Sequence, residues 1–484
     1  MADFTPKDSK IQAAACLRDA GLQSRVFAPS NSEYDACKSS YWSHTARLAP
    51  ACVVGPRSAS EVSAALKALV LANEKFAIRG TGHASPPGVN NIDGGVTIDL
   101  GLLDSVQYDE ATATVSFGPG VRWLDVYQEV QKHGRIVVGG REGQNGVAGY
   151  LLGGGNNWLT STKGWACDSV IAYETVLADG SIVTVDRDTH PDLFRALKGG
   201  GNNFGIVTKF TMSTIPCERI WGGVAISTKE YIPDVIQLTS NFTENLSRYP
   251  DSSLIVLVGY IPDMKDTAVV TGVMETRGVE NVPIFEEWER LPKIMNTAKP
   301  KTMLEIGIET SQASDNYNTW FTLTIKNDKS IMAKAVELHG ELVEELKALI
   351  PASDFGTQCV FGPLPALVGK HSVAAGGNVM GLDRVGRDGV LVQMNTMVKT
   401  AEQLALVYPR QKAWVEAVRA YAAAVDGGDL GWLFMNYADG SQDVLGSYGA
   451  DNVAFMREVA AKYDPKGVFQ MLCPGGWKIL QVAI

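Results

Sequence analysis

A histidine at the end of a glycine-bearing turn is the residue best placed to do chemistry in this chain. A short apolar stretch leads into the run Ile78-Arg79-Gly80-Thr81-Gly82-His83. Gly80 and Gly82 allow positive φ and close backbone approach, so amide groups can converge on a phosphate, and Arg79 adds positive charge. His83 offers a nucleophilic ring nitrogen beside the bound group. A histidine after a strand is also a common structural residue, so this run alone leaves both interpretations open.

A second concentration of glycine lies further along the chain. Its members are Gly139, Gly140, Gly143, Gly146, Gly149, Gly153, Gly154 and Gly155. Another glycine-rich stretch runs from Lys198 to Val207 and contains Gly205. Glycine lets the main chain approach a ligand without a Cβ in the way. A flexible loop is the alternative, but such density ahead of a predicted hairpin favours contact with an extended ligand.

Several common catalytic signatures are absent from the sequence. It has no Gly-x-Gly-x-x-Gly motif, no Walker P-loop, no Gly-x-Ser-x-Gly elbow and no His-Glu-x-x-His pair. Its six histidines show no metal-ligand spacing, so we predict no metal site. These absences exclude nicotinamide-binding Rossmann enzymes, nucleotide hydrolases, serine hydrolases and zinc peptidases in their usual forms.

The elements that must position the histidine turn are short strands and helices without a regular βαβ repeat. Ser58 and Glu61 form a predicted capping box for a helix that ends near Asn73, and the strand 76–79 follows it. The other predicted elements before residue 213 are strands 96–100, 114–117 and 205–212, helices 123–133 and 191–197, and a hairpin over 173–185.

The pattern changes after Pro216, where the predicted strands lengthen. The elements are strands 254–260, 320–325 and 390–398, with long amphipathic helices over 331–350 and 402–425. They indicate an antiparallel sheet covered by helices, and therefore a second domain. In strand 390–398, alternation places Gln393 and Asn395 on one face, toward either a substrate cavity or solvent. A last predicted helix covers 452–462.

Bulk properties limit the partners and the compartment. The 484 residues allow two or three domains, and a net charge of −10 argues against nucleic acid and anionic membrane surfaces. No apolar stretch approaches the ~18 residues of a membrane span. The seven cysteines lack Cys-x-x-Cys spacing, Met1 to Lys7 lack the apolar core of a signal peptide, and the last residues are no peroxisomal signal. We therefore expect a cytoplasmic protein.

Several segments together match one known family of flavoproteins. They are Tyr41-Trp42-Ser43, Arg79 to His83, Gly164 to Asp168, Leu177 to Gly180, Pro191 to Val207, Asn436 to Asp439 and Tyr463 to Phe469. Over nearly its whole length the chain resembles the berberine bridge enzyme-like branch of the vanillyl-alcohol oxidase superfamily, especially its fungal members. The resemblance implies an α+β fold: a two-part PCMH-type FAD-binding domain (1–215 and 431–484) enclosing a substrate domain (216–430) with an antiparallel sheet covered by helices.

The resemblance also implies FAD as the cofactor, bonded through His83 to the flavin 8α-methyl group. The candidate cofactor-binding residues are His83, Arg79, Gly80, Thr81, Gly82, Gly143, Gly146, Val147, Gly149, Gly153, Gly154, Asn157, Gly164, Asp168, Gly205, Ile206, Val207, Asn436 and Tyr437. Doubly linked members carry a cysteine, as Cys-Pro-x-x-Gly, where this chain has Glu142-Gly143-Gln144-Asn145-Gly146. A single histidyl bond is therefore expected.

Tyr437 is the first candidate for the catalytic base, since the tyrosine of this Asn-Tyr segment serves so in related oxidative cyclases. It could instead only pack beneath the flavin. Gln393 and Asn395 are the other candidate catalytic residues, and Glu305 and Glu309 stay ambiguous.

The resemblance implies an FAD-dependent oxidase that removes hydride from a small secondary-metabolite substrate to flavin N5, with dioxygen giving hydrogen peroxide. Val147 is expected beside the face where dioxygen meets the flavin, one methylene smaller than a blocking leucine. The alternatives are a carbohydrate oxidase, a non-redox isomerase or cyclase on the same scaffold, and a cofactor-free binding protein. The identity of the substrate does not follow from the sequence.

Overall fold

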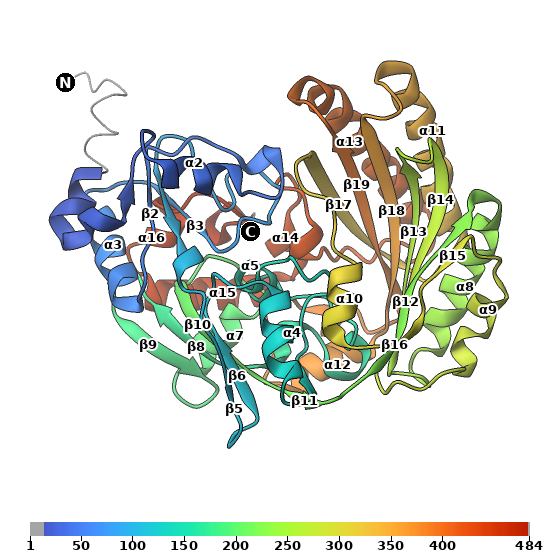
Figure 1. Ribbon diagram of the computed structural model, residues 1–484, viewed down its shortest axis with the longest axis horizontal. Coiled ribbons are helices and arrows are strands. Elements are labelled where there is room, and N and C mark those ends of the chain that lie inside the picture. The colour runs from blue at the N-terminus through green and yellow to red at the C-terminus, as the bar shows by residue number, and fades with distance from the viewer. Residues whose placement is uncertain (1–13, 483–484) are drawn as a thin grey trace.

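The computed structural model describes residues 14–482 (Figure 1). In its first sheet, the histidine turn follows the end of one strand. The strand order is β1-β2-β4-β3. The strands are β1 (Val26–Phe27), β2 (Cys52–Val54), β3 (Phe76–Arg79) and β4 (Val96–Asp99), of which β2, β4 and β3 run parallel. The predicted strand 76–79 is therefore confirmed, and the turn follows directly after its last residue.

Helix α3 (Ala59–Leu71) connects β2 to β3 and shows why the sequence predicted it well. The Ser58 side chain accepts a hydrogen bond from the Glu61 amide at 3.2 Å, which satisfies an amide of the first turn. The side chains of Val62, Leu66 and Leu69 are fully buried in a hydrophobic cluster that also contains residues of the first sheet. The predicted helix is confirmed, but only the Ser58 half of the predicted capping box forms, because the Glu61 side chain accepts from the Arg57 amide at 2.7 Å instead of from the Ser58 amide.

A second, antiparallel sheet follows in the order β5-β6-β10-β8-β9. Its strands are β5 (Val106–Asp109), β6 (Thr114–Phe117), β8 (Val170–Val176), β9 (Ile182–Asp186) and β10 (Ile206–Ser213), with α4 (Trp123–Gln131), α5 (Val147–Leu152), α6 (Thr160–Lys163) and α7 (Pro191–Leu197) in the same part of the chain. The predicted hairpin is the β8–β9 pair. The glycine-rich segments lie in the connections β7 to α6 and α7 to β10, where β7 is Arg135–Ile136.

A large antiparallel sheet forms the other half of the molecule in the order β15-β12-β14-β13-β18-β19-β17, with β16 paired to β12 (Figure 1). Its strands are β12 (Ile220–Thr228), β13 (Ser252–Ile261), β14 (Asp266–Glu275), β15 (Met295–Asn296), β16 (Lys299–Lys301), β17 (Tyr317–Lys326), β18 (Phe355–Leu364) and β19 (Gly389–Val398). Three helices cover one face: α8 (Ile232–Asn245), α11 (Lys329–Leu349) and α13 (Ala401–Ala424). The expected helix-covered antiparallel sheet is confirmed, so its opposite face is free to line a cavity.

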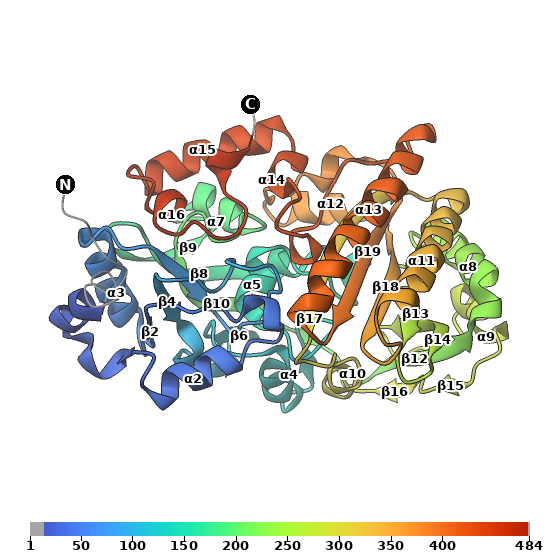
Figure 2. The same ribbon diagram turned by 90° about the horizontal axis from the view of Figure 1, so that it is seen from above.

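The end of the chain returns to the first half. Helix α15 (Ala450–Tyr463) packs on α7, and the Phe76 amide donates to the Leu472 carbonyl at 2.7 Å (Figure 2). One segment of the second half also contacts the first half: helix α12 (Leu367–Ala374) packs on α6.

Across residues 14–482, none of the helices has the length and apolar character needed to cross a membrane. The N-terminal run Met1 to Lys7 and the last two residues, on which part of the localisation prediction rests, lie outside the described residues.

A buried histidine beneath the large sheet predicts how stability varies with pH. His339 of α11 bonds Thr357 Oγ1 at 2.7 Å, and burial lowers its pKa to about 4. Its unfolded form titrates near 6.5, so stability present above that pH is lost as the pH falls toward 4. Compared with His339→Gln, wild type should lose roughly 2–3 kcal/mol more between about pH 7.5 and 4.5 in urea unfolding. Equal losses in both proteins would refute this assignment.

Candidate active site

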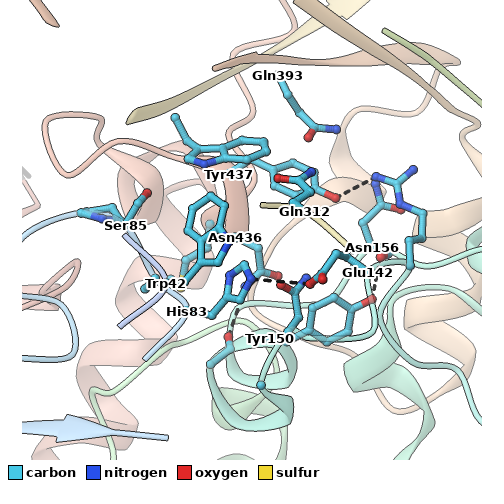
Figure 3. A pocket seen from close by; sticks show the side chains of 18 of the residues that line it. Trp42, His83, Ser85, Glu142, Tyr150, Asn156, Gln312, Gln393, Asn436 and Tyr437 are labelled. Atoms are coloured by element: carbon cyan, nitrogen blue, oxygen red, sulfur yellow. Dashed lines mark hydrogen bonds and ion pairs between the residues drawn. The ribbon is translucent and has the colours of Figure 1, made fainter. Parts of the chain in front are cut away.

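A cavity of about 700 Å³ lies between the two halves. One wall consists of the histidine turn, the glycine-rich loops and the closing segment around Asn436, and the other consists of the uncovered face of the large sheet (Figure 3). Sites for cofactors and small molecules commonly have volumes of roughly 300–1,000 Å³. Of the candidate cofactor residues, those on the wall are Gly80, Thr81, Gly82, His83, Gly146, Gly149, Gly205, Ile206, Val207, Asn436 and Tyr437.

Glycines of the cofactor wall lie so close to neighbouring residues that an added side chain would collide with them. At Gly146 an added Cβ would collide with the Thr81 hydroxyl, so the two glycine loops touch there. At Gly205 it would lie 2.5 Å from Thr175 Cγ2. The Asn436 side chain bridges the loops, accepting from the Gly155 amide at 2.9 Å and donating to the Gly149 carbonyl at 3.1 Å. Backbone groups therefore line a cradle suited to an extended, phosphate-bearing cofactor.

His83 projects from the turn into the cavity beside a carboxyl group (Figure 3). Its Nε2 lies 3.5 Å from Glu142 Oε2, and neither atom has a hydrogen bond. Burial, with a smaller contribution from Arg122, lowers the pKa of His83 to about 3. Burial also raises the pKa of Glu142, against the effect of backbone amides that donate to it. The imidazole is therefore neutral at neutral pH, the state in which a ring nitrogen keeps the lone pair of a nucleophile.

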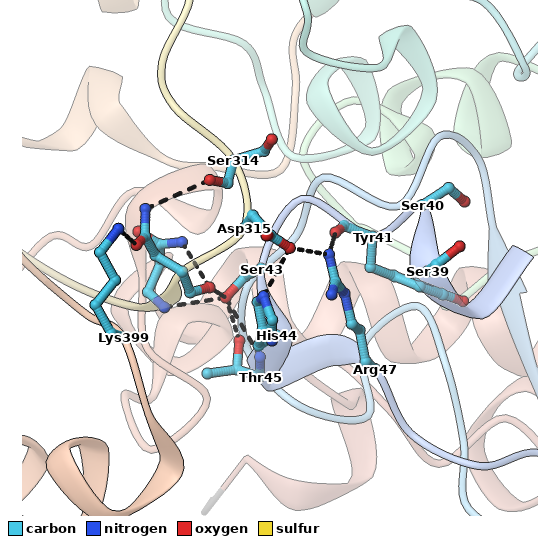
Figure 4. Close-up of polar contacts among 12 residues, drawn as sticks. Ser39, Ser40, Tyr41, Ser43, His44, Thr45, Arg47, Ser314, Asp315 and Lys399 are labelled. Carbon is cyan, nitrogen blue, oxygen red and sulfur yellow. Dashed lines mark hydrogen bonds and ion pairs between the residues drawn. The ribbon is translucent and has the colours of Figure 1, made fainter. Parts of the chain in front are cut away.

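Trp42 fixes the plane of the imidazole. The two rings stack with centroids 4.6 Å apart and an interplanar angle of 12°. The next residue, Ser43, donates to the Asn316 carbonyl at 3.2 Å, and nearby Arg47 donates to Asp315 at 2.9 Å (Figure 4). These contacts connect the segment that carries Trp42 to the loop ahead of β17, so both halves of the molecule hold the histidine in place.

Tyr437 lies where the two walls meet. Its phenol oxygen accepts a hydrogen bond from Arg141 at 2.8 Å, and its ring stacks on Trp320 of β17 with centroids 6.1 Å apart (Figure 3). The guanidinium of Arg141 also lies over the ring of Trp158, 5.5 Å from its centroid. A positive charge bonded to the phenol oxygen stabilises negative charge on that oxygen. This geometry suits Tyr437 to accept a proton from a substrate.

The sheet wall supplies Gln393 but not Asn395 to the cavity surface. Both face the same side of β19, as the alternation predicted, and Gln393 lines the cavity. Asn395 lies between Trp320 and Gln358 of the adjacent strands, is 1% exposed and is not among the residues that line the cavity, so the expectation that it lines the cavity is corrected.

The two acidic candidates, Glu305 and Glu309, differ in whether they reach the cavity. Glu305 is an exposed residue that caps α10 (Met303–Glu309) through the Thr302 amide. Glu309 does reach the cavity, but it is paired with Lys301 and Thr297.

Arg79 turns away from the cavity. Its guanidinium bonds Asp99 at 2.7 Å and lies over the ring of Tyr41, 4.5 Å from the centroid. The side chain is only 6% exposed. Arg79 therefore supports the turn from behind, which corrects its expected placement beside the cofactor.

Val147 and Asp168 are also placed elsewhere. Val147 is fully buried in the core, whereas its neighbour Ala148 lines the cavity, so the expected position of Val147 beside the flavin face is corrected. The Asp168 carboxylate accepts hydrogen bonds from Ser372 at 2.7 Å and Asn378 at 3.1 Å. It fastens the α12 segment to the first half of the molecule instead of lining the cavity.

The remaining candidates shape the loops without reaching the cavity. They are Gly143, Gly153, Gly154, Asn157 and Gly164. At Gly143 a Cβ would meet Leu124 and the Gly307 carbonyl, and Asn157 donates to the carbonyls of Gly155 and Gly164. Their role in this structure is to allow close packing behind the cofactor wall.

Sequence reasoning missed Trp42, Arg141 and Glu142 as residues of the site. A signal was available only for Glu142, because a lone acid stood at the position where related proteins carry a reactive cysteine. Arg141 and Trp42 reach the site through contacts with Tyr437 and His83 that no local pattern encodes.

Comparison with known proteins agrees with this geometry. Residues 50–186 match a family of FAD binding domains. The FAD-dependent monooxygenase sdcF of Emericella nidulans is 37% identical over 465 residues, which cover 95% of this chain and 96% of the relative. The FAD-dependent monooxygenase drtC of Aspergillus calidoustus is 34% identical over 482 residues, covering 99% of this chain and 92% of the relative.

A solved structure shares the fold at low identity. It is the glucooligosaccharide oxidase of Acremonium strictum, described with a 6-S-cysteinyl, 8α-N1-histidyl FAD, with a TM-score of 0.76, 18% identity and coverage of 94% of this chain and 97% of the other. Fold, cavity and relatives together define an FAD-linked oxidoreductase. The chain belongs to the berberine bridge enzyme-like family of FAD-dependent oxidoreductases found in fungi.

Proposed function

We propose that this enzyme oxidises a small organic substrate by hydride transfer to FAD held covalently through His83 alone, with dioxygen as the final acceptor and hydrogen peroxide as product. The observation that carries the proposal is the Arg141–Tyr437 pair, which lies between the wall that bears His83 and the sheet wall. A cofactor on the first wall and a substrate on the second would meet at this pair.

The residues present fit FAD. The cradle at Gly146 and Thr81 excludes side chains, and His83 lines the cavity with its Nε2 atom free of hydrogen bonds. Bound FAD supplies a two-electron acceptor. Tyr437 accepts the proton that the substrate loses from oxygen, with Arg141 stabilising the charge on the phenol oxygen, and Gln393 orients the substrate by hydrogen bonding.

Three alternatives use the same site. The names of the two relatives are those of monooxygenases, which would place an oxygen atom of dioxygen in the product. A non-redox isomerase or cyclase would change the substrate without reducing the flavin. A carbohydrate oxidase is the third possibility, and the glucooligosaccharide oxidase shows that the fold supports it.

Anaerobic stopped-flow mixing with a panel of benzylic and allylic alcohols and phenols tests the proposal. We expect at least one compound to bleach the flavin, and hydrogen peroxide to form in equal amount when air is admitted. Product that carries label from ¹⁸O₂ would favour the monooxygenase, and conversion without bleaching would favour the isomerase or cyclase.

Access of dioxygen gives a further prediction at Ala148. Its Cβ lies 3.5 Å from the position a Cβ would take on Gly80, so it borders the cavity beside the histidine turn. A leucine would fill space comparable to a small gas molecule in a wall that cannot relax freely. We expect Ala148→Leu to slow air reoxidation of photoreduced enzyme by at least roughly tenfold, about 1.4 kcal/mol of barrier. Unchanged reoxidation, with peroxide assayed alongside, would exclude this route.

A further inference from the structure

Polar and apolar side chains are segregated across the sheet wall of the cavity. Across the order β12-β14-β13-β18-β19-β17, the first three strands face the cavity with apolar residues or glycine. The cavity-facing side chains that define the two ends are Val224, Val270, Ile255 and Leu257 on the first three strands, and Gln358 and Gln393 on β18 and β19. The wall therefore has an apolar half and a polar half that carries the two amides and also contains Met397 of β19.

The apolar half is open to the cavity. Ile255 and Leu257 are partly exposed, whereas the alternate residues of β13, such as Val256, are buried against the helices. Gly272 deepens this half, because a Cβ there would lie 2.7 Å from Ile255 Cγ2 and 3.2 Å from the Trp158 ring. Two strand spacings make this surface roughly 10 Å wide. Such a surface is stabilised by covering it with hydrocarbon.

The polar half presents an unsatisfied amide. The Nε2 atom of Gln393 is buried and has no hydrogen bond, and Gln358 lies beside it on the same wall. Leaving a buried amide without a partner is costly, so a ligand oxygen is expected there. Trp320 and Tyr437 complete this half with stacked rings.

The ionisable groups on the cavity wall already have polar neighbours within the described residues. Arg141 bonds Tyr437, Glu142 lies against His83, and Glu309 bonds Lys301. A charged substrate would lose hydration on entering a cavity whose sheet wall is apolar over one half. A sugar would leave most of its hydroxyls against the apolar half.

We infer that the substrate is a neutral amphiphile whose oxygenated end lies between Gln393 and Tyr437 and whose hydrocarbon part covers the half formed by Val224, Val270, Ile255 and Leu257. This inference rests on the proposed function, because it names the substrate class of the same site.

Calorimetric titration of the flavin-loaded protein tests the inference with three probes: 4-hexylresorcinol, resorcinol and xylobiose. We expect 4-hexylresorcinol to bind at least about tenfold more tightly than resorcinol, because its alkyl chain is buried, and xylobiose to bind more weakly than either. Equal affinity for the two resorcinols, or tighter binding of xylobiose, would overturn the inference. Failure of the proposed function would show separately, as a bound flavin that none of the panel compounds bleaches under anaerobic conditions.

Variants separate the two halves of the wall. Val270→Thr changes shape little, and Leu257→Gln places an amide on the apolar half, so both should reduce the advantage of the alkyl chain to less than about threefold. Gln393→Leu should weaken the binding of both resorcinols by a similar factor, so the ratio of their two dissociation constants should stay as in wild type. The same ratio in all three variants would overturn the assignment of the halves.

Discussion

We expect His83→Ala to abolish covalent attachment of the flavin while leaving the fold intact. His83 is the one described histidine on the cavity wall, and its pKa of about 3 keeps the ring nitrogen neutral and nucleophilic at neutral pH. Alanine removes the nucleophile and leaves the backbone cradle unchanged. Denatured wild-type protein should fluoresce in a gel after acid treatment, and the variant should show no flavin band.

A matched substitution controls for nonspecific effects. His133→Ala removes a histidine that stacks on Tyr108 and lies outside the cavity, so attachment should be complete in that protein. Glu142 stands 3.5 Å from His83 where doubly linked relatives have a cysteine, and a carboxylate cannot form a thioether. Peptide mapping should therefore find flavin on the His83 peptide alone. Flavin retained by His83→Ala would contradict the single histidyl bond.

The parts of the fold that follow from local sequence could be predicted. The Ser58 cap, the β8–β9 hairpin and helix α7 after Pro191 depend on residues within one turn or one hairpin of each other. Periodicity likewise indicated the long strands β13, β17 and β19. Strand order could not be predicted in this way, and strands β12, β14 and β18 were missed although they complete the same sheet.

The site was predictable only where a motif marked it. His83 and Tyr437 stood in recognisable segments, but the Arg141–Tyr437 contact joins residues 296 positions apart. Arg79 illustrates the opposite error, since its charge suggested a phosphate and the fold supplied Asp99 instead.

Neighbouring residues of one helix also face different directions, about 100° apart. Val147 and Ala148 begin α5, and only the phase of that helix decides which of them borders the cavity. Asn395 shows the same limit in a strand, because alternation gave its face but not its burial to 1% exposure.

The second large effect is expected at Tyr437, the proposed proton acceptor. We expect Tyr437→Phe to slow anaerobic flavin reduction by about 100-fold or more, since general-base catalysis contributes roughly 10²–10⁴ in rate. Only the phenol oxygen is lost, and the ring still stacks on Trp320 and packs edge-to-face with Phe434, so the flavin spectrum and ligand affinity should be retained. Stopped-flow bleaching by a substrate found in the panel measures the rate directly.

A matched tyrosine and the partner cation distinguish catalysis from packing. Tyr408→Phe removes a phenol that bonds Asp439 outside the cavity, and it should reduce flavin at the wild-type rate. Arg141→Met keeps a long apolar side chain over Trp158 but removes the charge-assisted bond to the phenol oxygen, so its reduction rate should fall as well. Adding Arg141→Met to Tyr437→Phe should then cost little more, because the guanidinium acts through that oxygen. Full additivity of the two losses would mean that Arg141 contacts the substrate itself, and wild-type bleaching by Tyr437→Phe would assign the base to another group.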